Sequence, residues 1–351
     1  MKRYGFALIG CGMIAEYHAK AIAQLPNAKL VAVSSRSADN ARKVASPYGA
    51  RIYTDYTELL RQQDVHVVNI CTPSGAHLEP AVATAAAGKH VIVEKPLEIT
   101  LERCDRIIEA CRRAGVTLVT IFPSRFSDAS QLLKKTVDSG RFGRFTLGDA
   151  YIKWWRPQSY YDSGGWRGTW QLDGGGALMN QSIHAIDLLQ WLMGPVKSVV
   201  GFTDTLAHER IEVEDTAVAA VLFASGALGV IVGTTSAHPG MLKRIEISGT
   251  GGTVIMEEEE FRKWEFAQPA PDDEKIRAEF AHKLSSGGGA SDPRAINYEY
   301  HRRQFADLLA ALDRGGAPLI DGAEGRKAVE IILAVYRASQ EGRRIDLPLK
   351  A

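Results

Sequence analysis

A glycine-rich turn near the start of the chain lies between a short apolar run and a helical pattern. Residues 4–9 are mostly apolar and long enough for a buried strand, and Gly10-Cys-Gly-Met-Ile-Ala15 follows directly. The apolar periodicity from Ala15 to Leu25 then predicts a helix. A strand, a Gly-x-Gly-x-x-Ala turn and a helix in this order are what a dinucleotide-binding fold requires. The turn therefore predicts a doubly wound α/β domain at the beginning of the chain.

Each small residue of this turn has its own physical task. Gly10 allows a sharp turn after the strand, and Gly12 has no Cβ, so a pyrophosphate can approach the backbone. Ala15 keeps the helix close to the sheet, and the helix N-terminus offers N–H groups and a positive dipole end to phosphates. We expect Gly10, Gly12, Met13 and Ile14 to bind a cofactor; the alternative is an ordinary tight turn.

Length and composition limit the remaining choices. The chain has 351 residues, 45% of them hydrophobic, which suggests two domains with sizeable cores. A net charge of +1 gives no electrostatic case for a nucleic acid or an anionic membrane as a partner. No apolar run is long enough to span a bilayer, and no signal peptide is evident. The four cysteines lack metal-ligand spacing, so we expect reduced thiols, no metal and a cytoplasmic protein.

The predicted second strand ends in Ser34-Ser35-Arg36-Ser37, without a carboxylate. In NAD enzymes of this fold an acidic residue at this place usually binds the ribose 2′-hydroxyl. Arg36, with Ser35 beside it, could instead hold a 2′-phosphate, which favours NADP(H). The alternative is a solvated Arg36 with NAD(H) bound through the backbone.

Two later strands also end in residues suited to a ligand. The carboxyl ends of the strands face the ligand crevice in a doubly wound sheet. The strand 65–71 ends at Cys71-Thr72-Pro73, and His77 follows at the start of a helix, where packing is nearly as strong an explanation as cofactor contact. The strand 90–93 ends at Glu94-Lys95-Pro96. At that edge Lys95 could hold a substrate oxygen or stabilise alkoxide charge, with Glu94 fixing its position; a surface salt pair is the alternative.

The first domain is expected to span residues 1–122, and the second residues 123–351. The second begins with a helix that opens at Arg125-Phe126, followed by a loop at 156–170 rich in aromatics and arginines among glycines. Tyr160 and Tyr161 in this loop suggest stacking on a sugar, whereas partly buried aromatics in a loop are the alternative.

A helix predicted from residue 177 follows three glycines at 174–176. Asn180, His184 and Asp187 are spaced four and three apart, so they share one face. A polar helical face that follows three glycines indicates a binding or catalytic site. His184 on this face has a side chain suited to proton transfer. The alternative is a core histidine. Residues 196–266 then form a succession of strand patterns joined by short turns, which predicts an open, mostly antiparallel sheet.

Taken together, these motifs resemble the glucose–fructose oxidoreductase/inositol dehydrogenase (Gfo/Idh/MocA) family over essentially the whole chain. The segments that carry the likeness are Gly10–Ala15, Cys71–Pro73, Glu94–Pro96 and Gly175–Asp187. The resemblance implies that Lys95 and His184 act in catalysis, and that the open sheet forms a homodimer or homotetramer. It places Trp166, Arg167 and Tyr298 at the cofactor, as in anhydrofructose reductases.

One departure from the family pattern affects the mechanism. Polyol dehydrogenases of the family carry an aspartate four residues before the histidine, where this chain has Asn180. Asparagine can orient a hydroxyl or the histidine, but it cannot take a proton. Branches that act on nucleotide-linked sugars are similar in using asparagine here, and residues 160–170 also resemble that branch.

The predicted function is therefore NAD(P)-dependent oxidoreduction of a CH–OH group on a sugar, cyclic polyol or sugar derivative. Lys95, Asn180 and His184 are the expected catalytic residues, and Arg125, Tyr160 and Tyr161 are expected to join them in binding substrate. Two alternatives stay open: an NAD-dependent glycosidase of the same fold, and a non-enzymatic cofactor-binding regulator. The presence of both Lys95 and His184 argues against the regulator.

Overall fold

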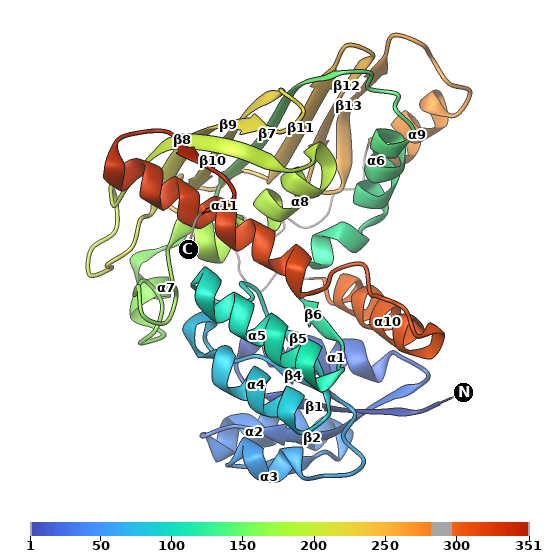
Figure 1. Ribbon diagram of the computed structural model, residues 1–351, viewed down its shortest axis with the longest axis vertical. Helices are drawn as coiled ribbons and strands as arrows, with labels where there is room; N and C mark the ends of the chain where they lie inside the picture. The colour runs from blue at the N-terminus through green and yellow to red at the C-terminus, as the bar shows by residue number, and fades with distance from the viewer. Residues whose placement is uncertain (1, 282–296, 350–351) are drawn as a thin grey trace. The chain divides into compact units, whose positions relative to one another are not determined.

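The computed structural model describes residues 2–281 and 297–349 (Figure 1). Within these ranges the chain forms two compact units, one of residues 2–123 and 297–329, the other of residues 124–281 and 330–349. The sequence assigns all of 123–351 to the second domain, whereas the contacts group 297–329 with the first unit. The reason is apolar packing, because Phe305, Leu308 and Leu309 are buried in the core of the first unit.

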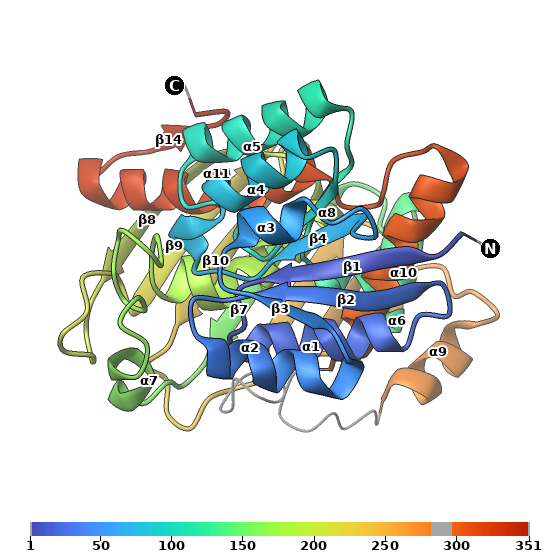
Figure 2. The same ribbon diagram turned by 90° about the horizontal axis from the view of Figure 1, so that it is seen from below.

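The first unit is built on a six-stranded parallel sheet in the order β3-β2-β1-β4-β5-β6. This order confirms the predicted doubly wound fold. Helices α1 and α2 lie on one face of the sheet, and α4 and α5 lie on the other (Figure 2). The elements are β1 (Tyr4–Ile9), α1 (Met13–Ala23), β2 (Ala28–Ser34), α2 (Ala38–Ala45), β3 (Arg51–Tyr53), α3 (Tyr56–Leu60), β4 (Val67–Ile70), α4 (Leu78–Ala86), β5 (His90–Val93), α5 (Leu101–Ala114), β6 (Leu118–Thr120) and α10 (Glu299–Arg314), with short 3₁₀ turns at Ser46–Tyr48 and Ser74–Ala76.

The core of this sheet explains why the ends of three strands lie next to each other. All of β1 and β4 is buried, as expected for strands covered by helices on both faces. Because β1, β4 and β5 are adjacent and parallel, their carboxyl ends meet at one edge. The segments that begin at Gly10, Cys71 and Glu94 therefore leave the sheet together.

The second unit is built on an eight-stranded sheet in the order β13-β12-β11-β7-β10-β9-β8-β14. Its pairs are antiparallel except for β7 with β10, so the predicted open, mostly antiparallel sheet is confirmed. Its elements are α6 (Asp128–Asp138), β7 (Phe145–Lys153), α7 (Gln158–Asp162), η4 (Ala177–Ser182), α8 (Ile183–Met193), β8 (Val196–Asp204), β9 (Thr216–Phe223), β10 (Leu228–Thr234), β11 (Arg244–Gly249), β12 (Gly252–Glu257), β13 (Glu260–Phe266), α9 (Asp273–Phe280) and β14 (Ile345–Asp346), with η3 (Pro123–Phe126) at the border and α11 (Gly322–Glu341) in both units.

Helix α8 and the turn before it pack closely on one face of this sheet because two strands carry glycine there. A Cβ at Gly148 of β7 would lie 2.7 Å from the Met193 side chain, and one at Gly233 of β10 would lie 2.5 Å from Ser182 Oγ. The sequence predicts one regular helix from residue 177. The structure instead has a π-helical turn, η4, followed by α8. π-turns are frequent at functional sites.

None of the described helices is both long and apolar enough to cross a membrane.

Candidate cofactor and active-site residues

The glycine turn has the conformation and the open space that a dinucleotide needs. Gly10 has φ +93°, and a Cβ there would lie 2.5 Å from the Cys71 carbonyl oxygen, so only glycine fits. Gly12 is the N-cap of α1; no side chain caps this helix, and a Cβ at Gly12 would meet nothing within 4 Å. The N–H groups of the first turn, where Met13 and Ile14 lie, are thus left for an acceptor from outside the helix. These features fit the diphosphate of NAD(H) or NADP(H).

The end of β2 presents Arg36 to solvent. Ser37 caps α2 by accepting a hydrogen bond from the Asn40 N–H at 3.3 Å, and Ser35 Oγ accepts one from the Ser37 N–H at 3.2 Å. Arg36 is exposed, and its side chain has no hydrogen bond or ion pair among residues 2–281 and 297–349. It is therefore available to a ligand, and the preference for a 2′-phosphate stays a prediction.

His77 connects two of the turns at the sheet edge. Its ring is buried, with Nε2 3.0 Å from the Thr72 carbonyl oxygen and Nδ1 2.9 Å from the Pro96 carbonyl oxygen. Burial lowers the pKa of this imidazole. The two ring nitrogens thus contact the segment after β4, which contains Thr72 and Pro73, and the segment after β5, which contains Lys95. A direct contact of His77 with the cofactor stays a prediction.

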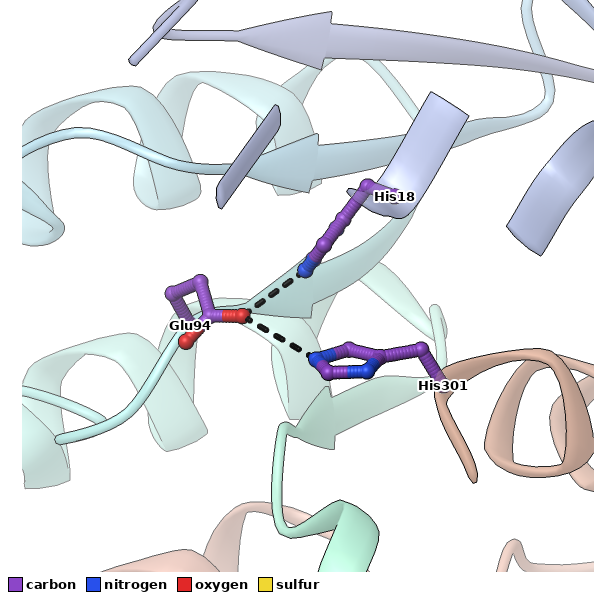
Figure 3. Close-up of side chains that lie close together, drawn as sticks. All are labelled: His18, Glu94 and His301. Atoms are coloured by element: carbon purple, nitrogen blue, oxygen red, sulfur yellow. Dashed lines mark hydrogen bonds and ion pairs between the residues drawn. The ribbon is translucent and has the colours of Figure 1, made fainter. Parts of the chain in front are cut away.

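Glu94, at the end of β5, is buried beside two histidines. Its Oε1 lies 2.7 Å from His18 Nε2 and 3.9 Å from His301 Nε2 (Figure 3). Its Oε2 accepts a hydrogen bond from the Lys95 N–H at 3.0 Å. Burial alone would raise the pKa of this carboxyl, but the hydrogen bond from His18, the electrostatic interaction with the His18 and His301 rings and, last, the charge of Lys95 hold it at about 2. The carboxylate is therefore ionised next to Lys95.

In the second unit, Glu214 closes the start of η4 by accepting three hydrogen bonds. They come from the Gly176 N–H at 2.8 Å, the Leu178 N–H at 2.7 Å and the Tyr336 hydroxyl at 2.9 Å. A Cβ at Gly176 would lie 1.8 Å from the Glu214 carbonyl oxygen, and one at Gly175 would lie 2.1 Å from the Tyr336 hydroxyl. The glycines before the helix thus make room for Glu214 and Tyr336. Burial raises the pKa of Glu214 to about 7.

Asn180 and His184 are the two positions between residues 177 and 190 that are not buried. Asn180 Nδ2 donates a hydrogen bond to Asp173 Oδ1 at 2.6 Å, and its Oδ1 accepts one from Gln181 Nε2 at 2.9 Å. The other Asp173 oxygen accepts from the Gly168 N–H at 2.9 Å. Asp173 therefore fixes the orientation of the Asn180 amide.

The aromatic loop joins this network through Tyr160. The Tyr160 hydroxyl accepts a hydrogen bond from Gln181 Nε2 at 2.9 Å, and the Arg167 guanidinium lies 4.6 Å from the Tyr160 ring and 5.2 Å from the Trp166 ring. Tyr161 differs, since it is buried with its hydroxyl 2.8 Å from Thr235 Oγ1. Tyr160, Arg167 and Asn180 thus belong to one connected group, whereas Tyr161 packs inside the unit.

Arg125 forms a buried ion pair with the third residue of the predicted polar face. Its guanidinium donates to both Asp187 oxygens, at 2.8 and 2.6 Å, and the two side chains are 1% and 0% exposed. Asp187 therefore points into the protein and not toward a site, which corrects the expectation of a three-residue face. The pair gives Arg125 a structural role; its role in substrate binding stays a prediction. Tyr298, at the N-cap of α10 in the first unit, is 36% exposed.

Three residues of the site have no signal in the sequence. Glu214 is 38 positions from Gly176, Tyr336 is 122 positions from Glu214, and Asp173 is seven from Asn180. No spacing rule relates such positions, because the contacts depend on how the second unit folds. The glycines at 174–176 indicate a close approach of some kind, but not its partner.

Known proteins share both halves of this architecture. Residues 4–122 match the model of an oxidoreductase family with an NAD-binding Rossmann fold, and residues 130–255 match that of the GFO/IDH/MocA C-terminal domain. The WlbA dehydrogenase from Bordetella pertussis, solved in complex with NADH and UDP-GlcNAcA, is 37% identical, with a TM-score of 0.91 over 99% of each chain. The scyllo-inositol 2-dehydrogenase (NAD(+)) of Bacillus subtilis is 30% identical over 98% of this chain and 96% of its own. The myo-inositol 2-dehydrogenase of Thermotoga maritima is 29% identical over 97% of both.

Proposed function

Because this chain belongs to the GFO/IDH/MocA family and is an oxidoreductase with an NAD-binding Rossmann domain, we propose that it oxidises a ring hydroxyl of a nucleotide-linked sugar. The substrate class is supported by the 37% identical WlbA dehydrogenase, whose structure holds UDP-GlcNAcA. Asn180 and the 160–170 loop support the same class, since both resemble the branch that acts on such sugars. The observation that carries the proposal is this likeness over the full length of the chain.

The cofactor supplies one piece of chemistry when bound: the dinucleotide accepts or gives a hydride. The residues of this chain do the rest. Lys95 donates a hydrogen bond to the reacting oxygen and stabilises the negative charge that develops there. His184 takes the hydroxyl proton during oxidation and returns it during reduction. Asn180, held by Asp173, orients a hydroxyl but does not move a proton. Gly10, Gly12 and the first turn of α1 hold the diphosphate.

The test is a substrate comparison in the presence of NAD⁺ and NADP⁺. We expect UDP-GlcNAcA or another UDP-linked sugar to give NADH or NADPH absorbance at a higher kcat/KM than myo-inositol or levoglucosan. A clear preference for a free polyol would contradict the proposed nucleotide-linked substrate, although the protein would still be a dehydrogenase. Release of the sugar from UDP with tightly retained cofactor and no net NADH would instead establish the glycosidase.

Replacing Arg36 with aspartate is expected to weaken NADPH binding at least about tenfold while NADH binding changes much less. A 2′-phosphate near an arginine gains a charge-assisted hydrogen bond, and a carboxylate there would repel it. We propose that Arg36 gives the wild-type chain tighter binding of NADPH than of NADH. Fluorescence titration of both reduced cofactors measures this, with Arg42→Asp, on the exposed side of α2, as the control. Equal losses for both cofactors, or none, would exclude a 2′-phosphate role.

The outward face of the large sheet supports an oligomer. Four adjacent strands expose apolar side chains on it: Leu147 of β7, Val200 and Phe202 of β8, Val218 of β9, and Leu228 of β10. Phe202 is 78% exposed and pairs with Val218, and Leu228 pairs with Leu147, so the side chains form one surface, the apolar sheet face. Such a patch is typical of an interaction site. We propose that a second copy of this chain covers it.

Replacing Phe202 with glutamate is then expected to dissociate the assembly. Burying an unpaired carboxylate in an apolar interface is costly, so the oligomer weakens while each protomer stays folded. Light scattering should give a multiple of 38.3 kDa for the wild type and a mass near 38.3 kDa for the variant. Ile52→Glu, at a 42% exposed apolar position on β3, should leave the mass unchanged. A wild-type mass of one chain would overturn this assignment.

A further inference from the structure

Three buried side chains from distant parts of the first unit converge on one point, which we call the histidine–glutamate cluster: His18, Glu94 and His301. They come from α1, the end of β5 and α10, and both imidazoles point at the carboxylate of Glu94 (Figure 3). All three residues are buried, with His18 fully so. A carboxylate in such a place is costly unless hydrogen bonds hold it, so the geometry of those bonds matters.

The tautomer of His18 follows from the Asn69 amide in the orientation that it has in this structure. Asn69 Nδ2, which can only donate, lies 2.9 Å from His18 Nδ1, so Nδ1 accepts a hydrogen bond. In a neutral ring the proton is then on Nε2, from which it is donated to Glu94 Oε1 at 2.7 Å. The other oxygen, Oε2, accepts from the Lys95 N–H at 3.0 Å. The hydrogen bonds therefore converge on Glu94, whose carboxylate accepts from His18 on one side and from the Lys95 N–H on the other.

His18, Glu94 and His301 each offer one atom that could bind a metal ion, and these three atoms lie within 4.8 Å of one another. Two histidines and one carboxylate are a known set of metal ligands. Metal binding needs the lone pair of a neutral imidazole nitrogen. On His18 that nitrogen is Nε2, which holds the proton donated to Glu94 while Asn69 occupies Nδ1. With the proton on Nε2 the arrangement is a hydrogen-bonded anion, and the cluster then contributes charge.

When the His18 ring is neutral, that charge is a single negative one. Glu94 is ionised, and burial lowers the pKa of His301 to about 4, so this imidazole is neutral at pH 7. The titratable groups that face Glu94 come from every element packed around it: His18, Cys71, His77, Lys95 and His301. Lys95 is the lone cation of this set at neutral pH when His18 is neutral. The carboxylate therefore favours the charged form of Lys95.

We propose that His18 and Glu94 are positioning residues for Lys95. His18 fixes the Glu94 carboxylate, which holds the Lys95 backbone through one oxygen and keeps the Lys95 ammonium charged through its field. Because His18 lies on α1, the helix whose first turn is assigned to the cofactor, the cluster also couples that helix to Lys95. This inference rests on the proposed role of Lys95 in catalysis.

A titration of Lys95 tests the inference without any substrate. Reductive methylation with a ¹³C label keeps the lysines charged, and the Lys95 signal is the one lost in Lys95→Met. We expect the midpoint of its titration to move to lower pH by at least about one unit in Glu94→Gln, and by less in His18→Ala. His18→Gln, which keeps a donor near the position of Nε2, should restore most of the wild-type value. His90→Gln, at the opposite end of β5, should leave it unchanged.

Turnover adds the second readout. Glu94→Gln and His18→Ala should lower kcat by about 10- to 100-fold, with NADH affinity within about threefold of wild type, because misplacing a catalytic group costs rate more than binding. An unmoved Lys95 titration, or parallel losses of NADH affinity and melting temperature, would overturn the inference. So would a stoichiometric metal ion in the purified protein whose removal changes activity. If Lys95→Ala itself keeps full turnover while the titration shifts, the proposed function fails and the inference about charge does not.

Discussion

Replacing Lys95 with methionine is expected to lower kcat by about 10²- to 10⁴-fold, with little change in cofactor affinity. Methionine keeps the length of the side chain but removes both the donor and the charge. Stabilisation of a developing oxyanion and proton transfer each contribute on this scale. The backbone of residue 95 would still donate to Glu94, so the sheet edge should keep its shape. Initial rates with a nucleotide-linked sugar, together with fluorescence titration of NADH, measure both quantities.

Lys89→Met provides the matched control. Lys89 precedes β5 as Lys95 follows it, and its ammonium donates to the Gln62 carbonyl oxygen at 2.9 Å, outside the candidate site. This variant should keep kcat within about twofold of wild type. If Lys89→Met and Lys95→Met lose activity equally, the loss reflects folding and not chemistry.

The companion variant His184→Ala separates the two proposed roles. A base that accepts a proton gives a rate that depends on pH, so this variant should lose at least about tenfold in kcat and should flatten the acidic limb of the pH profile. Lys95→Met should leave that limb in place. Identical pH profiles for wild type and His184→Ala would remove His184 from proton transfer.

The parts of this molecule that were predictable from the sequence depend on short stretches of chain. The strand, the two glycines and the helix of the nucleotide-binding turn follow one another directly in the sequence. The conformation at Gly10 and Gly12 therefore depends on local sterics. The same holds for the charged residues after β5, whose position at a sheet edge follows from the strand that ends there. Alternation of apolar residues was enough to predict the open sheet, because one of its faces is packed and the other is not.

What the sequence did not reveal depends on contacts between distant segments. His18 reads as one of several residues in an amphipathic helix, and its pairing with Glu94, 76 positions away, exists because β1 and β5 flank β4 in the folded sheet. Asp187 fits a polar helical face at its spacing, yet it points to Arg125. The sequence also does not predict that residues 297–329 belong to the first unit. The amphipathic pattern of α10 shows that one face is buried, but not which unit covers that face.

Replacing Arg125 with methionine is expected to destabilise the second unit by about 3–5 kcal/mol. Asp187 would stay buried and charged without its bidentate partner, and breaking a buried ion pair from one side carries this cost. The loss should appear as a lower midpoint in urea, and kcat should fall too, because Asp187 lies on α8 three residues after His184. Arg42→Met, which breaks an exposed pair with Asp39, should not change the midpoint measurably.

The double variant Arg125→Met/Asp187→Leu distinguishes structure from substrate binding at Arg125. Removing both charges and filling the space with apolar groups is often neutral or stabilising, so the double variant should recover most of the lost stability. If Arg125 only anchors α8, kcat and KM should recover with it. If Arg125 binds substrate as the sequence predicts, the restored protein should keep a raised KM, because no apolar side chain replaces a guanidinium at a hydroxyl or a phosphate. If the double variant is as unstable as Arg125→Met alone, the unpaired charge of Asp187 is not the cause of the lost stability.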